Sequence, residues 1–423
     1  MIALIRALAL LGPVAALWLA LAVRWPSGRD VAAMIVASAW NLLALAAVNA
    51  VALSAGWWTF HADGAVVAGT PVDLLIGWAL LWGALPAHAA RRLPLPLTAA
   101  VLAWADLALM PLAAPVVRLG PGWLYGEALA VAVALVPGLL LARWTRDDRR
   151  LPWRAVAQVV LAGGLMLGLP VALTGVWRQP AWVIGLYAQL LAVPMTLGLA
   201  AVREFASAGG TPLPYDPPRR LVTGGPYAYV RNPMQASMAG SFLLLGALDV
   251  RFLAAAVAAV TYGAGLAAWH EGEQLATRHG EAWTAYRARV RPWWPRFRPY
   301  PSTPPATLYV AEGCGQCRSL GRWITRRRPV ALRITAAEDH PHGIRRMTYE
   351  RSDGVRAQGV AAFAHTAGHL HLGWALVGWI LLLPGIAWFA QLCADAFGAG
   401  PRTVTRRQPQ DPGSSAAAPR RPA

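Results

Sequence analysis

Long runs of apolar residues dominate the chain from its beginning to about residue 270. Each run is roughly 18 to 22 residues long, the length that a helix rising about 1.5 Å per residue needs to cross about 30 Å of hydrocarbon. The pattern therefore predicts a polytopic α-helical membrane protein with about nine spans. The predicted spans cover residues 4–23, 32–54, 71–90, 96–114, 124–142, 156–176, 181–201, 234–249 and 252–269.

The arginines of the connecting loops alternate along the chain. The first, third, fifth and seventh loops are rich in Arg, whereas the other four contain only Arg118, Arg178 and Arg251. Because cytoplasmic loops carry an excess of basic residues, we predict a multi-pass protein of a bacterial inner membrane, with its N-terminus outside and its C-terminal region in the cytoplasm. A crossing by the further apolar stretch 372–389 would place the Arg-rich tail outside. We therefore expect that stretch to dock on the membrane or to pack against the protein.

Composition agrees with this membrane assignment. The chain is 57% hydrophobic and only 14% charged, whereas roughly a quarter of residues are charged in soluble proteins. The net charge of +18 would suggest nucleic-acid binding in a soluble protein. Here the basic residues are all Arg and sit mainly in loops and in the tail, where membrane topology accounts for them, so we predict no nucleic-acid partner.

The composition changes after Tyr300, where a Pro-rich linker precedes a polar, Arg-rich segment. We therefore predict N-terminal membrane helices over residues 1–150, a second membrane domain over 151–300 and a small α/β domain over 306–402. Residues 403–423 lack any periodicity and are rich in Pro, Gln, Ser, Ala and Arg. We expect this tail to be disordered.

Gly and Pro punctuate the loop between the seventh and eighth predicted spans, residues 221–235. The loop resembles the Gly-Pro-Tyr-x-x-x-Arg-His-Pro-x-Tyr motif of the phospholipid and isoprenylcysteine carboxyl methyltransferase superfamily. The matching residues are Gly225, Pro226, Tyr227, Arg231 and Pro233. Asn232 replaces the usual His and Gln235 replaces the usual Tyr. Because Asn is not a base, proton abstraction at this position is not expected.

A second block of the same superfamily follows the ninth predicted span. The residues at matching spacing are Glu271, Leu275, Gly280, Tyr286 and Val290. Gly272 occupies the position of a second Glu, and the usual Val-Pro-Arg ending becomes Val-Arg-Pro. The two blocks together make the resemblance specific over about residues 155–300. It implies S-adenosylmethionine as methyl donor and a lipidic or isoprenoid methyl acceptor.

The residue types of both blocks suit this cofactor. An Arg such as Arg231 can bind its carboxylate and, as the candidate catalytic residue, position it, while Glu271 can bind its ammonium group. Aromatic rings such as those of Tyr227 and Tyr229 attract a sulfonium and stack on adenine. The candidate cofactor-binding residues are Gly225, Pro226, Tyr227, Tyr229, Arg231, Asn232, Pro233, Glu271, Tyr286 and Arg291.

Structural roles remain open for the same residues. Arg231 can be a topology anchor, and Glu271 can pair with Arg278 at a helix end. Tyr227 and Tyr229 can belong to the interfacial aromatic belt. Gly225 and Pro226 can simply shape a turn.

A further group of candidate functional residues is the pair Cys314 and Cys317, spaced Cys-Gly-Gln-Cys. It follows a predicted strand at 306–310 and precedes a predicted helix at 318–326. A Cys at a helix N-terminus is favoured as thiolate by free N–H groups and the helix dipole, to which Arg318 would add. We therefore predict Cys314 as the attacking thiol and Cys317 as the resolving thiol, with a cytoplasmic thiol as reductant.

The residues that follow the Cys pair point to a more specific family resemblance. A hairpin-like pair of strands over 346–360 and an apolar helix ending near Pro384 resemble the DCC family of thiol-disulfide oxidoreductases, over about residues 306–402. The resemblance implies a thioredoxin-like fold. That family usually carries Asp-Gly before its Cys pair, where this chain has Ala311-Glu312-Gly313.

Alternative functions stay open. Cys-x-x-Cys is also half of a zinc site, and the candidate partners are His340, His342, His365, His369 and His371. The leading prediction is a membrane methyltransferase fused to a redox domain. The others are a thiol-disulfide oxidoreductase anchored by a noncatalytic membrane region, and a noncatalytic scaffold with a zinc-stabilised module. Asp73, Asp106 and Glu127 lie in or near predicted spans and can line a path for a lipidic acceptor.

Overall fold

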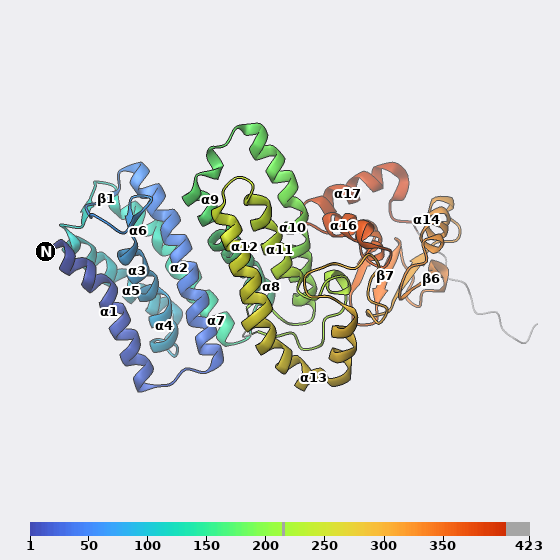
Figure 1. Ribbon diagram of the computed structural model, residues 1–423, viewed down its shortest axis with the longest axis horizontal. Coiled ribbons are helices and arrows are strands. Elements are labelled where there is room, and N and C mark those ends of the chain that lie inside the picture. Colours follow the sequence, from blue (N-terminus) through green and yellow to red (C-terminus); the bar gives the residue numbers. More distant parts are fainter. Residues whose placement is uncertain (214–215, 403–423) are drawn as a thin grey trace, which may run out of the picture. The chain divides into compact units, whose positions relative to one another are not determined.

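The computed structural model describes residues 1–213 and 216–402, except for the side chains of residues 262 and 266–271. The chain is mostly helical (Figure 1) and divides into two compact units. Unit 1 contains Met1–Leu186, Phe205–Arg220 and Gly246–Val250, and unit 2 contains Tyr187–Glu204, Leu221–Leu245 and the chain from Arg251 onward. Long helix α10, Ala181–Ser207, contributes to both.

Unit 1 is built from apolar helices joined by short connections. Its helices are α1 Ile2–Val23, α2 Gly28–Ala55, α3 Val72–Trp82, α4 Ala84–Ala89, α5 Leu95–Leu109, α6 Trp123–Ala130, α7 Val136–Arg146, α8 Leu151–Ala162 and α9 Leu169–Thr174. Three of these helices continue into single 3-10 or π turns: η1 Met110–Ala113, η2 Val131–Leu135 and η3 Gly163–Gly168. Another 3-10 turn, η4 Val176–Arg178, follows α9. Two short antiparallel pairs join β1 Trp58–Phe60 with β4 Val117–Leu119, and β2 Val66–Val67 with β3 Thr70–Pro71.

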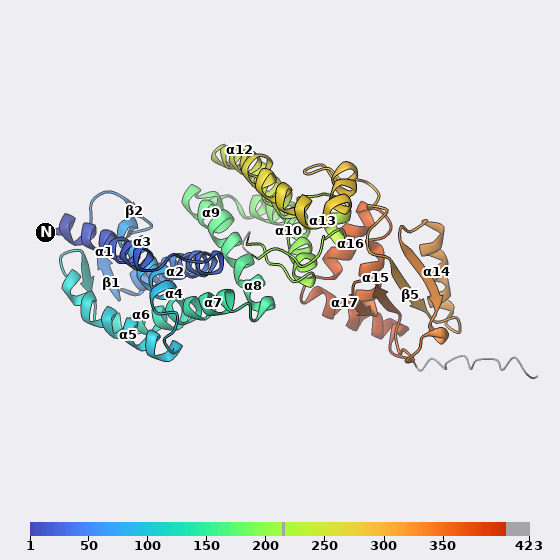
Figure 2. The same cartoon turned by 90° about the horizontal axis from the view of Figure 1, so that it is seen from below.

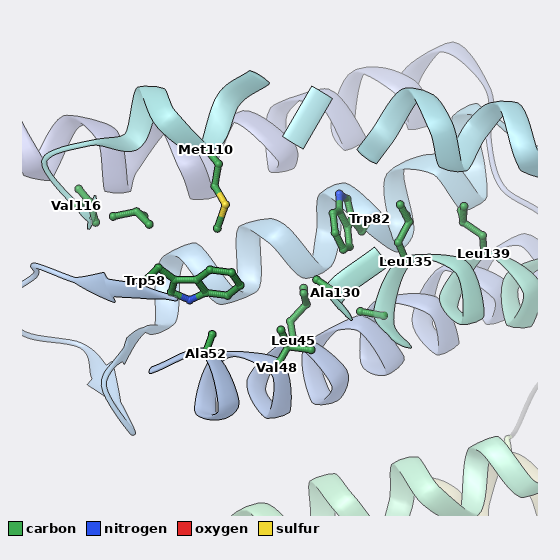
Figure 3. Packing of buried hydrophobic residues seen from close by; sticks show 12 residues of the cluster. Leu45, Val48, Ala52, Trp58, Trp82, Met110, Val116, Ala130, Leu135 and Leu139 are labelled. Atoms are coloured by element: carbon green, nitrogen blue, oxygen red, sulfur yellow. The ribbon is translucent and has the colours of Figure 1, made fainter. Parts of the chain in front are cut away.

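The core of unit 1 surrounds Trp58, which β1 delivers between the helices (Figure 3). The indole is fully buried among residues such as Leu45 and Leu135. Its Nε1 donates to Asn49 Oδ1 at 3.0 Å, which satisfies the one polar atom of the ring. A Cβ on Gly126 would lie 2.2 Å from the ring, so this packing requires glycine in α6.

Seven helices of the described chain are long and apolar enough to cross a membrane. They coincide with the first seven predicted spans: Ile2–Val23, Gly28–Ala55, Val72–Ala89, Leu95–Ala113, Trp123–Arg146, Leu151–Thr174 and Ala181–Ser207. The prediction of nine is not reproduced. The eighth segment forms α11, Pro233–Leu245, of only 13 residues. The ninth is helical throughout, as α12, Arg251–Tyr262, and the helical turns that follow it without a break. A helix of 13 residues is only about 20 Å long.

Unit 2 begins with α11 and α12. Helix α12 is followed without a break by the π turn η6, Gly263–Ala267, and by α13, Ala268–Arg289, which kinks at Gly280. The connecting segment before α11 contains the 3-10 turn η5, Gly225–Ala228. A buried cluster that includes Tyr229 and Tyr286 packs this segment against the end of α13 and against α16, Leu372–Leu381.

The C-terminal part of unit 2 forms a four-stranded sheet in the order β6-β5-β7-β8. β5, Ala306–Val310, and β6, Leu332–Ala336, are parallel and joined through α14, Gly315–Arg326. β7, Thr348–Arg351, runs antiparallel to β5 and pairs with β8, Arg356–Gln358. Figure 2 shows α14 beside β5, with α15, Val360–Ala367, on the other side of the sheet. The predicted strand 306–310, helix and hairpin are therefore confirmed as secondary structure.

The apolar stretch 372–389 does not form one straight helix. It divides into α16 and α17, Ile386–Ala394, which continues as the turn η8, Asp395–Ala399. The two halves are bent by 94° around the Pro384-Gly385 break. Ala375 and Trp379 of α16 are buried, whereas α17 contains no buried residue.

Candidate functional site

Cys314 lies in the turn between β5 and α14 and caps the helix. Its backbone is extended, with φ −103° and ψ 117°, and its Sγ accepts a hydrogen bond from the N–H of Cys317 at 3.4 Å. The turn that precedes it is held by Glu338, whose carboxylate accepts the N–H groups of Glu312 at 3.0 Å and Gly313 at 3.4 Å. The sulfur is therefore fixed where the unpaired N–H groups and the dipole of α14 favour negative charge.

Several groups stabilise the thiolate of Cys314. The hydrogen bond from the Cys317 thiol is the largest influence that lowers the pKa of Cys314, and the Cys317 N–H and the positive charge of Arg402 act in the same direction. The Arg402 guanidinium donates from Nη1 to Cys314 Sγ at 3.5 Å. Partial desolvation opposes this effect, but the pKa is still lowered. Cys314 is thus the thiol of the pair that ionises first.

The pKa of Cys317 is shifted in the opposite direction. Cys317 packs against the core of the sheet, next to Leu308, Val310 and Ile324. Burial, followed by the proximity of Cys314, raises the pKa of Cys317 to about 11. The two sulfurs therefore differ as an attacking thiolate and a protonated resolving thiol do.

The candidate zinc ligands serve other contacts. His369 Nδ1 lies 2.7 Å from the carbonyl oxygen of Val330, to which it donates, so its Nε2 accepts from the Tyr349 hydroxyl at 2.8 Å. His365 stacks on Tyr349 with ring centroids 5.2 Å apart. Burial lowers the pKa of His369 to about 4 and that of His365 to about 3. Among the described residues, no group of three or more His, Cys, Asp or Glu is arranged to hold a metal ion.

The two methyltransferase-like blocks, far apart in sequence, lie side by side in unit 2. The N–H of Arg231 donates to the carbonyl of Arg291 at 2.9 Å, and that of Asn232 donates to Pro292 at 3.1 Å. Two further backbone bonds run the other way, from Arg296 to Tyr229 and from Tyr300 to Ala228. Backbone hydrogen bonds thus join the two blocks directly.

The tyrosines of these blocks are used in packing. Tyr229 is fully buried, donates its hydroxyl to the carbonyl of Gly368 at 3.1 Å and meets the Trp379 ring edge to face. Tyr286 is 2% exposed and donates to the carbonyl of Tyr227 at 2.8 Å. Burial raises the pKa of Tyr229 and of Tyr286. Their rings offer no free face to a cofactor in this structure, and Tyr229 does not lie in an exposed aromatic belt.

The remaining candidates divide into exposed and buried groups. Arg231 is half-buried, donates to the carbonyl of Arg287 at 3.3 Å and lies over the Trp283 ring. Arg291 is exposed beside a surface depression of about 270 Å³, whose other lining residues are Arg289, Trp294, Pro295 and Arg296. Pro226 and Pro233 are buried, and Pro233 begins α11 after Asn232. The side chain of Glu271 lies outside the described residues. The accessible groups fit the carboxylate end of S-adenosylmethionine, whereas the buried tyrosines do not fit its sulfonium or adenine.

A buried ion cluster lies directly under Gly224 and Gly225. Arg351 of β7 donates to the carboxylates of Glu204, at the end of α10, and of Asp353. Gly225 has φ +54°, and a Cβ there would lie 3.0 Å from Glu204 Oε2. The start of the motif loop therefore rests on an ion cluster contributed by the end of α10 and by the sheet.

The carboxyl groups of unit 1 that were predicted to line a path have other surroundings. Asp73 pairs with Arg6 at 2.7 Å. Asp106 and Glu127 are both buried and lie close enough to each other to interact electrostatically. They form a contact between α5 and α6.

Three contributors were not recognised from the sequence: Glu338, Arg402 and the Glu204–Arg351 pair. In the sequence, two local features hinted at them: Glu204 is an acidic residue just after the predicted span 181–201, and Glu338 is an acidic residue just after β6. Comparison with known proteins adds no further assignment: no protein-family model matches the chain, and no curated protein or solved structure is significantly similar to it.

Proposed function

We propose that the protein is a membrane-spanning thiol-disulfide oxidoreductase whose reactive pair is Cys314 and Cys317. The observation that carries the proposal is the unequal environment of the two thiols. Cys314 caps α14, and its pKa is lowered by hydrogen bonds from Cys317 and by the charge of Arg402. Cys317 is desolvated on the sheet core, which raises its pKa to about 11. The βαβ unit followed by an antiparallel hairpin, with the Cys pair at the start of the first helix, supports a thioredoxin-like domain of the DCC type.

The proposed reaction transfers two electrons to a substrate disulfide. The Cys314 thiolate attacks one sulfur of the substrate, so that a mixed disulfide forms and one substrate sulfur leaves as thiolate and takes up a proton. Cys317 then loses its proton to solvent and attacks Cys314 Sγ, which breaks the mixed disulfide and releases the second substrate thiol. The Cys314–Cys317 disulfide that remains is reduced by a cytoplasmic dithiol, which regenerates both thiols and becomes a disulfide itself.

This proposal is tested on the full-length protein in lipid nanodiscs by equilibration with dithiothreitol buffers of defined potential, followed by mass spectrometry of alkylated peptides. Cys314 and Cys317 should change from two alkylated thiols to one disulfide in a single two-electron transition. Cys393, which is also a free thiol, is the internal control and should stay alkylated. Independent oxidation of Cys314 and Cys317, or no disulfide at any potential, would exclude the function.

A second candidate function is methyl transfer from S-adenosylmethionine to a lipidic acceptor. The specific observation in its favour is the backbone pairing of the two motif blocks, at Arg231 with Arg291 and at Asn232 with Pro292. When bound, this cofactor supplies a methyl group on a sulfonium that needs only correct positioning for in-line transfer. Arg231 and Arg291 are the residues of this chain that would hold its carboxylate.

Binding of radiolabelled S-adenosylmethionine followed by ultraviolet crosslinking tests this second function. The label should map between residues 221 and 300, compete with unlabelled cofactor and weaken in Arg231→Ala. The matched control is Arg326→Ala, an exposed Arg at the last turn of α14. Absence of competed label in protein whose Cys314 reacts normally would reject methyl transfer and leave the redox proposal intact.

A further inference from the structure

Helix α17 has an amphipathic pattern that is inverted relative to a helix on a water-facing surface. Its large apolar side chains point outward: Trp388 is 67% exposed, Phe389 63% and Leu392 47%. Phe397, in the following turn, is 84% exposed. In a water-exposed helix the apolar stripe faces the protein interior.

The polar side chains of the same helix point toward the protein. Gln391 Oε1 accepts the N–H of Val360 at 2.8 Å, and its Nε2 donates to Asp395 at 2.7 Å. The Asp395 carboxylate also forms an ion pair with Arg346, in which Arg346 Nη1 donates to Oδ1 and Nη2 donates to Oδ2, the latter at 2.8 Å. The inner face of α17 is thus fixed by hydrogen bonds and an ion pair, which leaves a stripe of aromatic and aliphatic side chains directed away from the domain.

The segment just before α17 contacts the end of a candidate membrane span. Arg203, in the last turns of the apolar helix α10, donates to the carbonyl of Leu382 at 3.1 Å. Leu382 follows α16, and α17 begins only four residues later, after the 94° bend. α10 belongs to the seven helices apolar enough to cross a membrane. The segment that joins α16 to α17 therefore contacts a candidate membrane span close to the end of that span.

We propose that α17 is an interfacial helix that docks on the lipid bilayer and holds the Cys314–Cys317 site at the membrane surface. Trp, Phe and Leu on one face are the side chains that enter the headgroup boundary, and Arg402 supplies a positive charge beside the helix for anionic lipid. The segment is directly connected to the reactive sulfur, because Arg402 donates both to the carbonyl of Gly398 at 2.8 Å and to Cys314 Sγ. The inference that substrate disulfides lie at the membrane surface rests on the proposed redox function, but the docking itself does not.

Spin-label accessibility tests the docking. The full chain with Cys314, Cys317 and Cys393 replaced by Ser is labelled at Phe389→Cys and reconstituted in nanodiscs of phosphatidylethanolamine and phosphatidylglycerol. Leu190→Cys, on the exposed face of α10, is the lipid-facing control, and Ser319→Cys, on the exposed face of α14, is the water-facing control. The oxygen-to-nickel-chelate accessibility ratio at position 389 should shift from the Ser319 value toward the Leu190 value.

Two outcomes would overturn the docking proposal. A ratio equal to that of Ser319 means that the stripe faces water, and low accessibility to both reagents means that another protein surface covers it. The functional consequence is tested separately, with one disulfide reagent supplied either on a lipid headgroup or free in solution. Trp388→Ser with Phe389→Ser should slow reduction of the lipid-linked disulfide and leave the soluble one unchanged. Equal slowing of both, or of neither, would reject the membrane-surface substrate, while no activity on either in the unaltered protein would instead reject the redox function.

Discussion

Replacing Arg402 by Gln should raise the pKa of Cys314, because it removes the one cation that touches the sulfur within the described chain. The Nη1 to Sγ distance of 3.5 Å corresponds to about 1 kcal/mol of attraction in a water-like dielectric, the appropriate limit because Arg402 is exposed. Since one pKa unit equals about 1.4 kcal/mol, the expected increase is about 0.7 unit. The hydrogen bonds from Cys317 remain, so the pKa stays below that of an ordinary cysteine.

The change should affect reactivity in a pH-dependent way. Below the pKa, an increase of about 0.7 unit lowers the thiolate fraction about fivefold, but the more basic thiolate is about twofold more nucleophilic. Alkylation of Cys314 should therefore be about two- to threefold slower at low pH and about twofold faster at high pH, so that the two pH profiles cross.

The assay is alkylation of Cys314 by monobromobimane in a Cys317→Ser, Cys393→Ser background, where the hydroxyl introduced at position 317 keeps a donor beside the sulfur. Arg402→Lys should retain most of the effect of the charge. Arg326→Gln, at the far end of α14, removes the same charge about 18 Å away by helix geometry and should leave the profile unchanged. An Arg402→Gln profile that coincides with that of the parent protein would refute the assignment of Arg402, and an equal shift in Arg326→Gln would show a nonspecific charge effect.

Three further substitutions test the surroundings of the site. Arg351→Ala should destabilise the sheet by about 3–5 kcal/mol in chemical denaturation, because it removes the cation from two buried carboxylates; Arg356→Ala, on an exposed pair, should cost at most about 1 kcal/mol, and equal losses would contradict the burial argument. Because the folded pKa of His369 lies at about 4, below the unfolded value of 6.5, the unfolded state binds more protons in between, and stability should fall as pH falls from 6.5 to about 4. In thermal unfolding between pH 4 and 6.5, His369→Gln should reduce the slope of the unfolding free energy against pH by about one bound proton. The exposed His342→Gln should leave that slope as it is, and an unchanged slope in His369→Gln would contradict the prediction. Gly225→Ala should destabilise by about 1 kcal/mol or more, because φ is +54° and Glu204 lies within 3.0 Å of the new Cβ; Gly272→Ala, in helical open space, should be neutral or stabilising, and equal behaviour of the two in thermal unfolding would remove the steric explanation.

Sequence periodicity predicted the elements well and their mutual contacts poorly. The first seven spans and the strand before Cys314 follow from local pattern, because the period and length of an apolar run determine the element. Arg402 reaches Cys314 from 88 residues away, and Glu204 reaches Arg351 from 147 residues away. No local pattern specifies such pairs. Arg318, the neighbouring Arg expected to stabilise the thiolate, illustrates the same limit, since the contact with Cys314 Sγ comes from Arg402.

The tyrosines of the motif show a different limit. Residue type alone suggested that Tyr229 and Tyr286 face a cofactor, because aromatic rings suit a sulfonium. Their burial depends on α16, which packs Trp379 against Tyr229, and α16 follows them by far in the sequence. The Gly-Pro-Tyr motif therefore identified the segment 221–235, whose backbone pairs with residues 291–300. It did not predict the direction in which the tyrosine side chains of the two blocks point.

The short helix α11 leads to a testable consequence for topology. If the eighth and ninth predicted spans form a hairpin that does not cross the bilayer, seven crossings remain. The predicted sides of the N-terminus and of the Cys pair are then unchanged. Because α11 has 13 residues and is about 20 Å long, the loop that follows it should not reach the opposite surface of a hydrocarbon layer of about 30 Å. Val250→Cys, at an exposed position of that loop, should therefore not react with a membrane-impermeant maleimide added to intact cells whose chain has no other cysteine. Trp177→Cys, exposed in the loop before α10, should react from outside, and Ser319→Cys should react only after permeabilisation. Strong outside labelling at Val250 would restore two complete crossings and show that the length of α11 does not limit the depth of the hairpin.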